Sequence, residues 1–329
     1  MNRKCVSVIT PCYNGEEFAD RFFRNIMEQT YQNIELIFVN DGSSDRTEEI
    51  AKSYISQFEQ TGRKLIYIFQ DNAGQAAAVN KGLEIFTGDY LMWMDSDDIL
   101  DKDNIEKKVE FLEANPEYGF VMCRGRVVKE DNLDFKIDEL KRIPPIGEDT
   151  FFRDMILEKN IVFTPGVYMA RAEAVLKAIP TRHIYESRVG QNWQLLLPLS
   201  YHFKCGYLKE ELFSYVIRSD SHSRHEKTLE QVLEKLRQHN DTLTVILTEM
   251  GLEDSDYMKM LKDKHVRKEF DNAYHYGDKK LLEEKYRELK QLGKVSKRDT
   301  LIYWAGKNKI MDILYSVFKD VKRWYRSKR

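Results

Sequence analysis

The first 125 residues predict an α/β domain built around a parallel β-sheet. Short runs rich in Val and Ile alternate there with segments whose apolar residues recur every three or four positions. Turn-forming residues separate these runs, which is typical of consecutive β–α–β units. From residue 226 onward, helical patterns rich in Lys and Glu follow one another. We therefore expect an α/β domain with a mostly helical C-terminal extension.

Five strands are expected in this first part, each a short β-branched or aromatic run bounded by polar residues. The expected strands are 5–10, 34–39, 65–69, 90–94 and 120–123. Helical spacing predicts the connecting segments. The apolar repeats that indicate these helices are Phe18, Phe22 and Ile26, then Ile50, Tyr54 and Phe58, then Ile105, Val109 and Leu112.

The rest of the chain divides into two further segments. Residues 126–225 are less regular, whereas residues 226–329 have helical patterns, with Gly293 as a helix stop. We expect one domain over 1–225, whose two halves meet near residue 125, and a separate helical region after it.

Composition and charge exclude several classes of protein. A net charge of −2 provides no overall field that would recruit nucleic acid. The chain has no run near the ~18 apolar residues that a membrane-spanning helix needs, and the apolar run before Pro11 is too short for a signal peptide. The cysteines form no CxxC pair, so we expect free thiols and a cytoplasmic location. They are Cys5, Cys12, Cys123 and Cys205.

The segment GDYLMWMDSDDIL, residues 88–100, places three carboxylates directly after an apolar strand. Such crowded like charges raise one another's pKa unless a cation lies among them. Side chains alternate along an extended chain, so Asp95 and Asp97 would face one ligand while Asp98 points away. Mg²⁺ and Mn²⁺ prefer oxygen ligands of this kind. The simpler alternative is an acidic start to the next helix.

Polar residues also follow three other expected strands, at the edge where open α/β sheets bind ligands. Tyr13 offers a flat surface for a base, Asp41 offers an acceptor for a base or ribose, and Gly74 lets the backbone approach a bulky ligand. The alternatives are a packed surface tyrosine, an ordinary turn and a helix with a small packing face. Four polar turns at one edge favour a ligand site.

Four motifs in this order resemble the nucleotide-sugar half of the family 2 glycosyltransferases, which have the GT-A fold. They lie within residues 5–125 and are VSVITPCYNG, IELIFVNDGSSDRT, DNAGQAAAVNKG and GDYLMWMDSDD. The resemblance implies a three-layer α/β/α domain that binds a nucleoside-diphosphate sugar, most often a UDP-sugar, with Mn²⁺ or Mg²⁺. It also implies transfer of the sugar to a glycan or lipid-linked acceptor in surface polysaccharide biosynthesis.

By the same resemblance, Pro11 and Tyr13 line the base and Asp41 holds the uracil or its ribose. Asp95 contacts the ribose or the metal, and Asp97 is the principal metal ligand of the Asp-x-Asp motif.

The resemblance weakens at the expected general base. Family members usually carry a Glu-Asp pair before a tryptophan, but this chain has Gln191 and Asn192 before Trp193. An amide does not accept a proton at neutral pH. Three alternatives follow: Glu186 supplies the base, the two amides orient an acceptor while leaving-group stabilisation carries the rate, or the chain is a non-catalytic nucleotide- or glycan-binding relative. A second departure is Val79, where many relatives carry Arg.

Other interpretations concern single features of the chain. A sugar-nucleotide pyrophosphorylase would need a glycine-rich basic loop near the N-terminus, whereas TPCYNGEEF has one Gly and two Glu.

Arg218 and Arg224 are candidate partners for phosphate oxygens, and His222 and His225 are candidate ligands of a metal or diphosphate. The alternative for all four is an exposed position. The oligomeric state stays open.

The last segment, residues 309–329, predicts a basic amphipathic helix. Residues 301–329 contain eight Lys or Arg and two Asp. Such a helix suits peripheral contact with an anionic membrane; the alternative is a helix docked on its neighbours. The apolar stripe consists of Ile310, Leu314, Val317, Val321 and Trp324.

Overall fold

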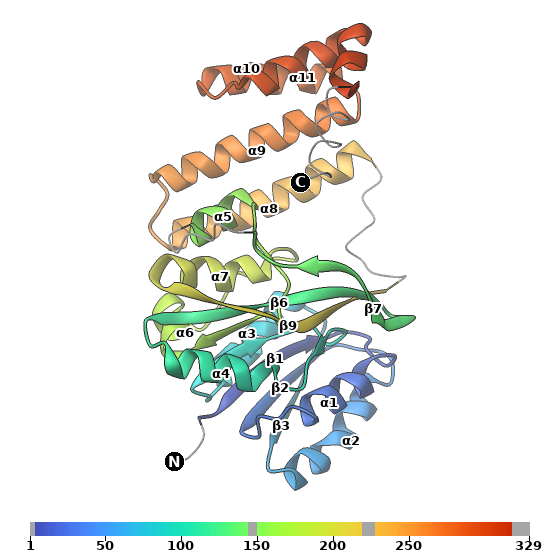
Figure 1. Cartoon of the computed structure of the whole chain (residues 1–329), viewed down its shortest axis with the longest axis vertical. Helices are drawn as coiled ribbons and strands as arrows, with labels where there is room; N and C mark the ends of the chain where they lie inside the picture. The colour runs from blue at the N-terminus through green and yellow to red at the C-terminus, as the bar shows by residue number, and fades with distance from the viewer. Residues whose placement is uncertain (1–3, 144–149, 219–227, 318–329) are drawn as a thin grey trace. The chain divides into compact units, whose positions relative to one another are not determined.

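The computed structural model describes residues 4–143, 150–218 and 228–317. The chain forms two compact units, Met1–Ser221 and His222–Arg329. In Figure 1 the first unit runs from blue to yellow and the second from yellow to red. The boundary expected after residue 225 falls on a stretch that the structure does not describe.

A nine-stranded sheet forms the centre of the first unit, in the order β3-β2-β1-β4-β8-β6-β9-β5, with β7 paired to β6. The four strands β3, β2, β1 and β4 are parallel. Strand β8 runs antiparallel to β4 and β6, and β9 runs parallel to β6. The strands are β1 Val6–Cys12, β2 Ile34–Asp41, β3 Lys64–Gln70, β4 Tyr90–Trp93, β5 Ile99–Leu100, β6 Tyr118–Lys129, β7 Asn132–Leu140, β8 Tyr168–Arg171 and β9 Lys204–Ile217.

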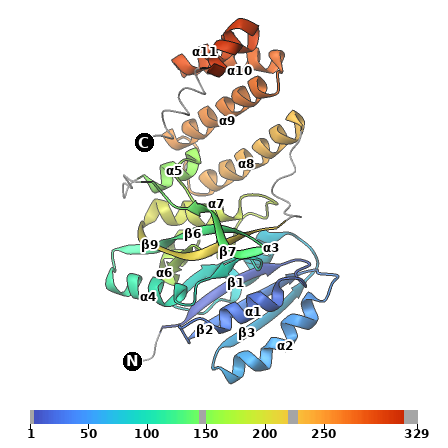
Figure 2. The same cartoon turned by 45° about the vertical axis from the view of Figure 1, so that its right-hand side comes forward.

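Helices cover the parallel strands on both faces, as the expected three-layer domain requires. Helices α1 and α2 pack against each other, and α3 packs on β1 and β2. Figures 1 and 2 show α1 and α2 grouped along one face of β1–β3. The helices of the first unit are α1 Ala19–Met27, α2 Thr47–Gln60, α3 Gln75–Ile85, α4 Asn104–Ala114, α5 Phe151–Leu157, α6 Ala172–Ala178 and α7 Gln191–His202.

The core explains why the central strands read as continuous apolar runs. Strands β1 and β2 are buried along their full lengths, because helices cover both faces of a parallel sheet. Aromatic rings fill the space between α1 and β2, with Phe23 and Phe38 centroids 4.8 Å apart. The spacing predicted for α1 is confirmed, whereas in α2 Ala51 is buried and Ile50 only partly so.

The second half of this unit contains structure that the sequence analysis did not predict. The strand expected at 120–123 extends over all of β6, and β7 forms a hairpin with it. Strand β7 was missed because most of its residues are exposed, so no apolar run marks it. An edge strand of this kind carries charged residues that discourage pairing with another chain.

The second unit consists of helices, as predicted. Side chains cap all four of the helices α8 to α11: Thr228 before α8, Ser255 before α9, Asp278 before α10 and Ser296 before α11. Gly293, with φ +66°, follows α10 and confirms the predicted stop. A core cluster that includes Phe270 joins α9, α10 and α11. The bounds of these helices are α8 Leu229–Glu249, α9 Asp256–His275, α10 Lys279–Gln291 and α11 Lys297–Lys307.

Two further expectations can be compared with the structure. All four cysteines are free thiols, as expected. Within the described ranges, none of the helices combines the length and the hydropathy that crossing a bilayer requires.

Candidate active site

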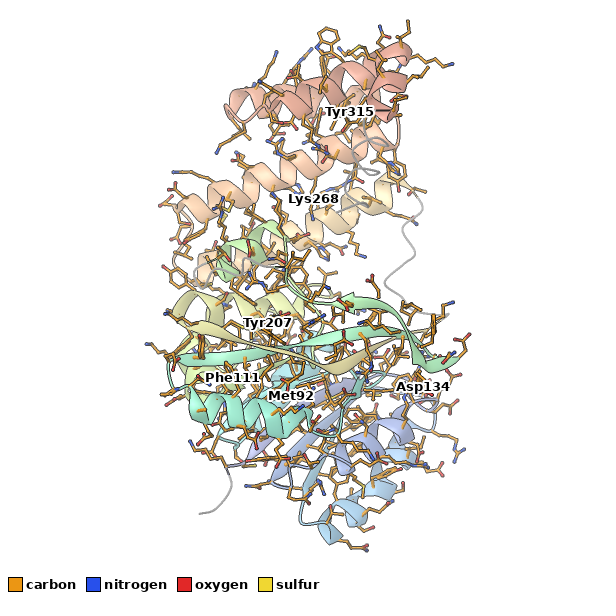
Figure 3. The ribbon with its side chains drawn as sticks, in the orientation of Figure 1. Met92, Phe111, Asp134, Tyr207, Lys268 and Tyr315 are labelled. Atoms are coloured by element: carbon orange, nitrogen blue, oxygen red, sulfur yellow. The ribbon has the colours of Figure 1, made fainter. Side chains whose placement is uncertain are left out.

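Three carboxylates meet where β4 ends and the chain turns into β5; Figure 3 labels Met92 within β4. One oxygen each from Asp95, Asp97 and Asp98 lies within 4.8 Å of the others. The expectation that Asp98 points away was wrong, because this segment is a turn and not an extended strand in which side chains alternate. Asp98 is buried, and its Oδ1 accepts a hydrogen bond from the backbone N–H of Val216 at 3.0 Å. Its Oδ2 is buried and has no hydrogen-bond partner among the described residues. Three convergent carboxylates with an unsatisfied oxygen form a donor set that fits Mg²⁺ or Mn²⁺.

The electrostatics of this cluster agree with that fit. Burial, followed by the charge of Asp97, raises the pKa of Asp95 to about 7. Burial is also the largest cause of the raised pKa of Asp97 and of Asp98. The metal-free cluster therefore resists full ionisation, and a divalent cation among the carboxylates would favour their charged forms.

Two arginines from distant parts of the chain counteract the rise in the pKa of Asp97, and one of them also donates a hydrogen bond to its backbone. The Arg21 guanidinium donates a hydrogen bond to the Asp97 backbone carbonyl at 2.6 Å. Arg218 and Arg21 both oppose the effect of burial on the Asp97 pKa. Arg218 also forms ion pairs with Glu17 at 3.2 Å and Glu130 at 3.9 Å. Positive charge therefore lies close to the aspartate turn, although carboxylates already partner Arg218.

A hydrogen-bonded relay joins the aspartates to the first turn of α7. Asp95 Oδ1 accepts from Gln75 Nε2 at 2.6 Å, and Gln75 Oε1 accepts from Gln191 Nε2. Beside it, Asn192 Oδ1 accepts from the indole N–H of Trp93 at 3.0 Å. The two amides that replace the family's usual acidic pair are therefore anchored to the end of β4.

Asp41 is buried at the end of β2, and both of its oxygens accept hydrogen bonds from the chain itself. Oδ1 accepts from Gln70 Nε2 at 2.6 Å and from the N–H of Ala73 at 2.9 Å, and Oδ2 accepts from the N–H of Gly74 at 2.9 Å. The carboxylate thus fixes the loop between β3 and α3. Its contact with a base or ribose stays a prediction.

Gly74 begins α3 with φ +93° and ψ 164°, a conformation that is essentially confined to glycine. A Cβ built on it would meet nothing within 4 Å, so the backbone conformation requires this glycine. Ala76, Ala77 and Ala78 are buried where α3 packs on the sheet. The three alanines therefore serve packing, whereas the approach of a ligand to Gly74 stays a prediction.

Pro11 and Tyr13 lie at the end of β1. Pro11 is buried within the strand, and Tyr13 is half exposed on the loop that follows. This loop is tied to the one after β2, because the Asn14 N–H donates to Ser43 Oγ and the Ser44 N–H donates to Asn14 Oδ1, both at 2.9 Å. The structure thus presents an exposed aromatic ring at the predicted edge of the sheet.

Glu186 is exposed on the loop before α7, where its Oε1 lies 3.5 Å from Nε2 of His183. Asn80 of α3 holds this loop through the backbone of Ile184, at 2.9 Å and 2.8 Å. Among the described residues, no hydrogen bond or ion pair connects Glu186 with the aspartate cluster. The other candidates, His222, Arg224 and His225, lie outside the described residues.

Sequence reasoning missed three residues that contact this site: Arg21, Gln75 and Trp93. Gln75 lies within DNAGQAAAVNKG, directly after the glycine that begins α3, and its position in that motif was the available signal. Arg21 lies in the middle of α1 and carries no local signal, because its contact spans 76 positions of the sequence.

Comparison with known proteins shows the family to which this chain belongs. The family model "Glycosyl transferase family 2" matches residues 7–179. An "Uncharacterized glycosyltransferase" of Haemophilus influenzae is 36% identical over 146 residues, 43% of this chain and 57% of the relative. The "Putative teichuronic acid biosynthesis glycosyltransferase TuaG" of Bacillus subtilis is 36% identical over 108 residues, 32% of this chain and 41% of the relative. The chain thus spans less than two thirds of either relative.

Solved structures share the fold at low sequence identity. S. aureus TarS 1-349 in complex with UDP-GlcNAc has a TM-score of 0.57 and 16% identity, over 99% of this chain and 92% of that one. The mannosyltransferase PcManGT from Pyrobaculum calidifontis, in complex with GDP-Man and Mn²⁺, has a TM-score of 0.54 and 15% identity, over 98% and 84%. With a GT-A fold and a family model matching more than half of its length, this chain belongs to glycosyl transferase family 2.

Proposed function

We propose that this chain is a metal-dependent glycosyltransferase. It moves a sugar from a UDP-sugar to a hydroxyl group of a glycan or lipid-linked acceptor, in the assembly of a surface polysaccharide. The observation that carries the proposal is the cluster of Asp95, Asp97 and Asp98 at the ligand-binding edge of a parallel sheet. Family membership supports the reaction class, and a relative named for teichuronic acid biosynthesis supports the setting.

On the donor side, Asp95 and Asp97 would hold the cation, with Asp98 completing the donor set. A bound divalent cation would offset the negative charge that develops on the departing nucleoside diphosphate. Tyr13 would stack on the base. Asp41 would act mainly by holding the loop that ends at Gly74, since that loop already occupies both of its oxygens.

On the acceptor side, Asn192 would orient the attacking hydroxyl. Its Oδ1 accepts from Trp93, which leaves the amide NH₂ as a donor toward a ligand. Glu186 is the only acidic residue between Arg182 and Asn192, and we propose it as the group that takes the proton from the acceptor. Its exposed loop, held to α3, lies directly before the helix that carries Asn192.

The test measures nucleotide release and thermal stability with a panel of UDP-sugars and GDP-sugars, with Mn²⁺ or with EDTA. We expect Mn²⁺-dependent stabilisation and release of UDP. Asp97→Asn should abolish both while leaving the circular dichroism spectrum unchanged. Turnover that persists undiminished in EDTA would contradict the metal-dependent mechanism.

A second candidate function is a nucleotide-binding relative without catalysis, which the two amides at Gln191 and Asn192 favour. It predicts tight UDP binding without hydrolysis or transfer under any condition. Transfer by the unaltered chain distinguishes the two functions. Glu186→Gln then tests the base, because it should reduce transfer by about 10²-fold or more if Glu186 is the base and should leave UDP binding unchanged.

A further inference from the structure

A short helix over residues 309–317 follows α11 in the second unit. Asn308 caps its start, since Asn308 Oδ1 accepts hydrogen bonds from the N–H groups of Ile310 at 2.9 Å and Met311 at 3.4 Å. The polar cap separates this helix from α11 and sets its direction.

One face of this helix is docked on α9. The hydroxyl of Tyr274 donates to Asp312, and the rings of Tyr274 and Tyr315 meet edge to face with centroids 5.8 Å apart; Figure 3 labels Tyr315. At 100° per residue, Asp312 and Tyr315 project from the same side of the helix. That side, which is partly polar, therefore faces the bundle.

The opposite side is an exposed apolar stripe made of Ile310, Ile313, Leu314 and Val317. Their spacing of i, i+3, i+4 and i+7 is the pattern that a docked helix normally turns toward a core. Here each of the four side chains is between 55% and 70% exposed. Leu301 and Trp304 of α11 are also exposed large apolar residues. We call the four residues of the stripe, Ile310, Ile313, Leu314 and Val317, the outer apolar surface.

The positive charge of the sequence that follows indicates which partner binds this surface. Residues 318–329 contain six Lys or Arg, one Asp and the aromatic pair Trp324 and Tyr325. An apolar helical stripe adjoining basic and aromatic residues fits the interface of an anionic bilayer, which takes up the apolar side chains and attracts the cations. A second copy of the chain would instead bring two basic segments together, which like-charge repulsion disfavours.

We propose that the outer apolar surface binds peripherally to an anionic lipid bilayer, with the apolar stripe of residues 310–317 inserted at the level of the headgroups. The inference goes beyond the proposed function and does not depend on it, because neither the aspartate cluster nor a nucleotide sugar takes part in the contact.

The test is cosedimentation of the full chain with vesicles. One set consists of phosphatidylcholine alone, and in the other phosphatidylglycerol replaces part of it. We expect binding to the anionic vesicles, little binding to the neutral ones, and weaker binding as salt is raised. The double variant Ile313→Ser with Leu314→Ser should lower the affinity for anionic vesicles about tenfold or more.

Phe135→Ser provides the matched control, because Phe135 of β7 is similarly exposed, at 63%, and lies in the other unit. It should bind vesicles like the unaltered chain. All three proteins should release UDP from a soluble donor at the same rate, so a failure of the proposed function appears separately from a failure of this inference.

Three outcomes would overturn the inference. The first is an absence of binding to either kind of vesicle. The second is anionic-vesicle binding that the double variant leaves unchanged. The third is a concentration-dependent dimer that the double variant abolishes, without vesicle binding, which would assign the surface to a second copy of the chain.

Discussion

The side chain of Gln75 connects the aspartate cluster with the first turn of α7 by hydrogen bonds. It donates to Asp95 and accepts from Gln191, so its amide has a fixed orientation. A carboxylate oriented in this way presents its remaining lone pairs in a constant direction, which is how outer partners of metal ligands raise affinity. Gln75 is therefore a positioning residue in our account and contacts neither the donor nor the acceptor.

We predict that Gln75→Ala lowers the affinity for Mn²⁺ by about 10–100-fold, the usual effect of losing such a partner. Titration calorimetry with Mn²⁺ and UDP measures this directly. Gln57→Ala, an exposed glutamine of α2, is the matched control and should have no effect. A variant at Gln75 that binds Mn²⁺ normally would assign the residue a role in packing alone.

Gly74 provides a second prediction, because its backbone conformation excludes other residues. We expect Gly74→Ala to destabilise the protein by about 1–3 kcal/mol in urea unfolding, and to weaken UDP binding by displacing the loop that Asp41 holds. Gly62→Ala is a matched control, since Gly62 also has positive φ and open space around its Cβ. It should cost comparable stability and leave UDP affinity unchanged; equal losses of affinity would contradict this reasoning.

Helix α4 is connected to the loop before β8 through a buried lysine. Lys108 is fully buried, and its Nζ donates to the carbonyl of Gly166 at 2.6 Å. The N–H of Gly166 in turn donates to the carbonyl of Trp93 at 2.8 Å. The helix thereby holds the loop around Gly166 against the end of β4, immediately before the aspartate turn.

Burial lowers the pKa of Lys108 from its usual value of 10.5 to about 8. The unfolded chain therefore binds more protons than the folded chain between these pH values, so stability should rise with pH there. We predict that the unaltered protein gains about 1–3 kcal/mol relative to Lys108→Met between about pH 8 and pH 10. Urea unfolding of both proteins at the two pH values tests this, and parallel curves would exclude a buried titrating lysine.

Burial and sequence separation explain which elements and contacts the sequence could and could not predict. Largely apolar runs identified β1 to β4. Strands β1, β2 and β4 are buried along their full lengths, and parallel strands covered on both faces leave few polar positions. Strand β7 escaped because exposed residues dominate it, although Leu133, Phe135 and Ile137 alternate with polar residues along its length. The aspartate cluster was visible as a local motif. The Gln75–Gln191 contact was not, since 116 positions separate its partners.

At the level of the entire chain, two separate cores predict two unfolding events. The second unit has its own apolar cluster around Phe270. We predict that Phe270→Ala, at a cost of about 3–5 kcal/mol, lowers one calorimetric transition and leaves the other in place. UDP with Mn²⁺ should raise only the transition of the first unit, because a ligand stabilises the unit that binds it. A single transition that shifts as a whole under both treatments would show that the units unfold together.

The hydrogen bond from Val216 to Asp98 has a consequence for folding during translation. The aspartate turn is translated early, yet Asp98 accepts its hydrogen bond from Val216, a residue of β9 that is translated 118 positions later. Contacts that distant form only after the intervening chain has emerged and the strand has paired. A nascent polypeptide that has not yet reached β9 thus lacks the hydrogen bond that fixes Asp98. Under the proposed function, the chain could act on a nucleotide sugar only after β9 has paired.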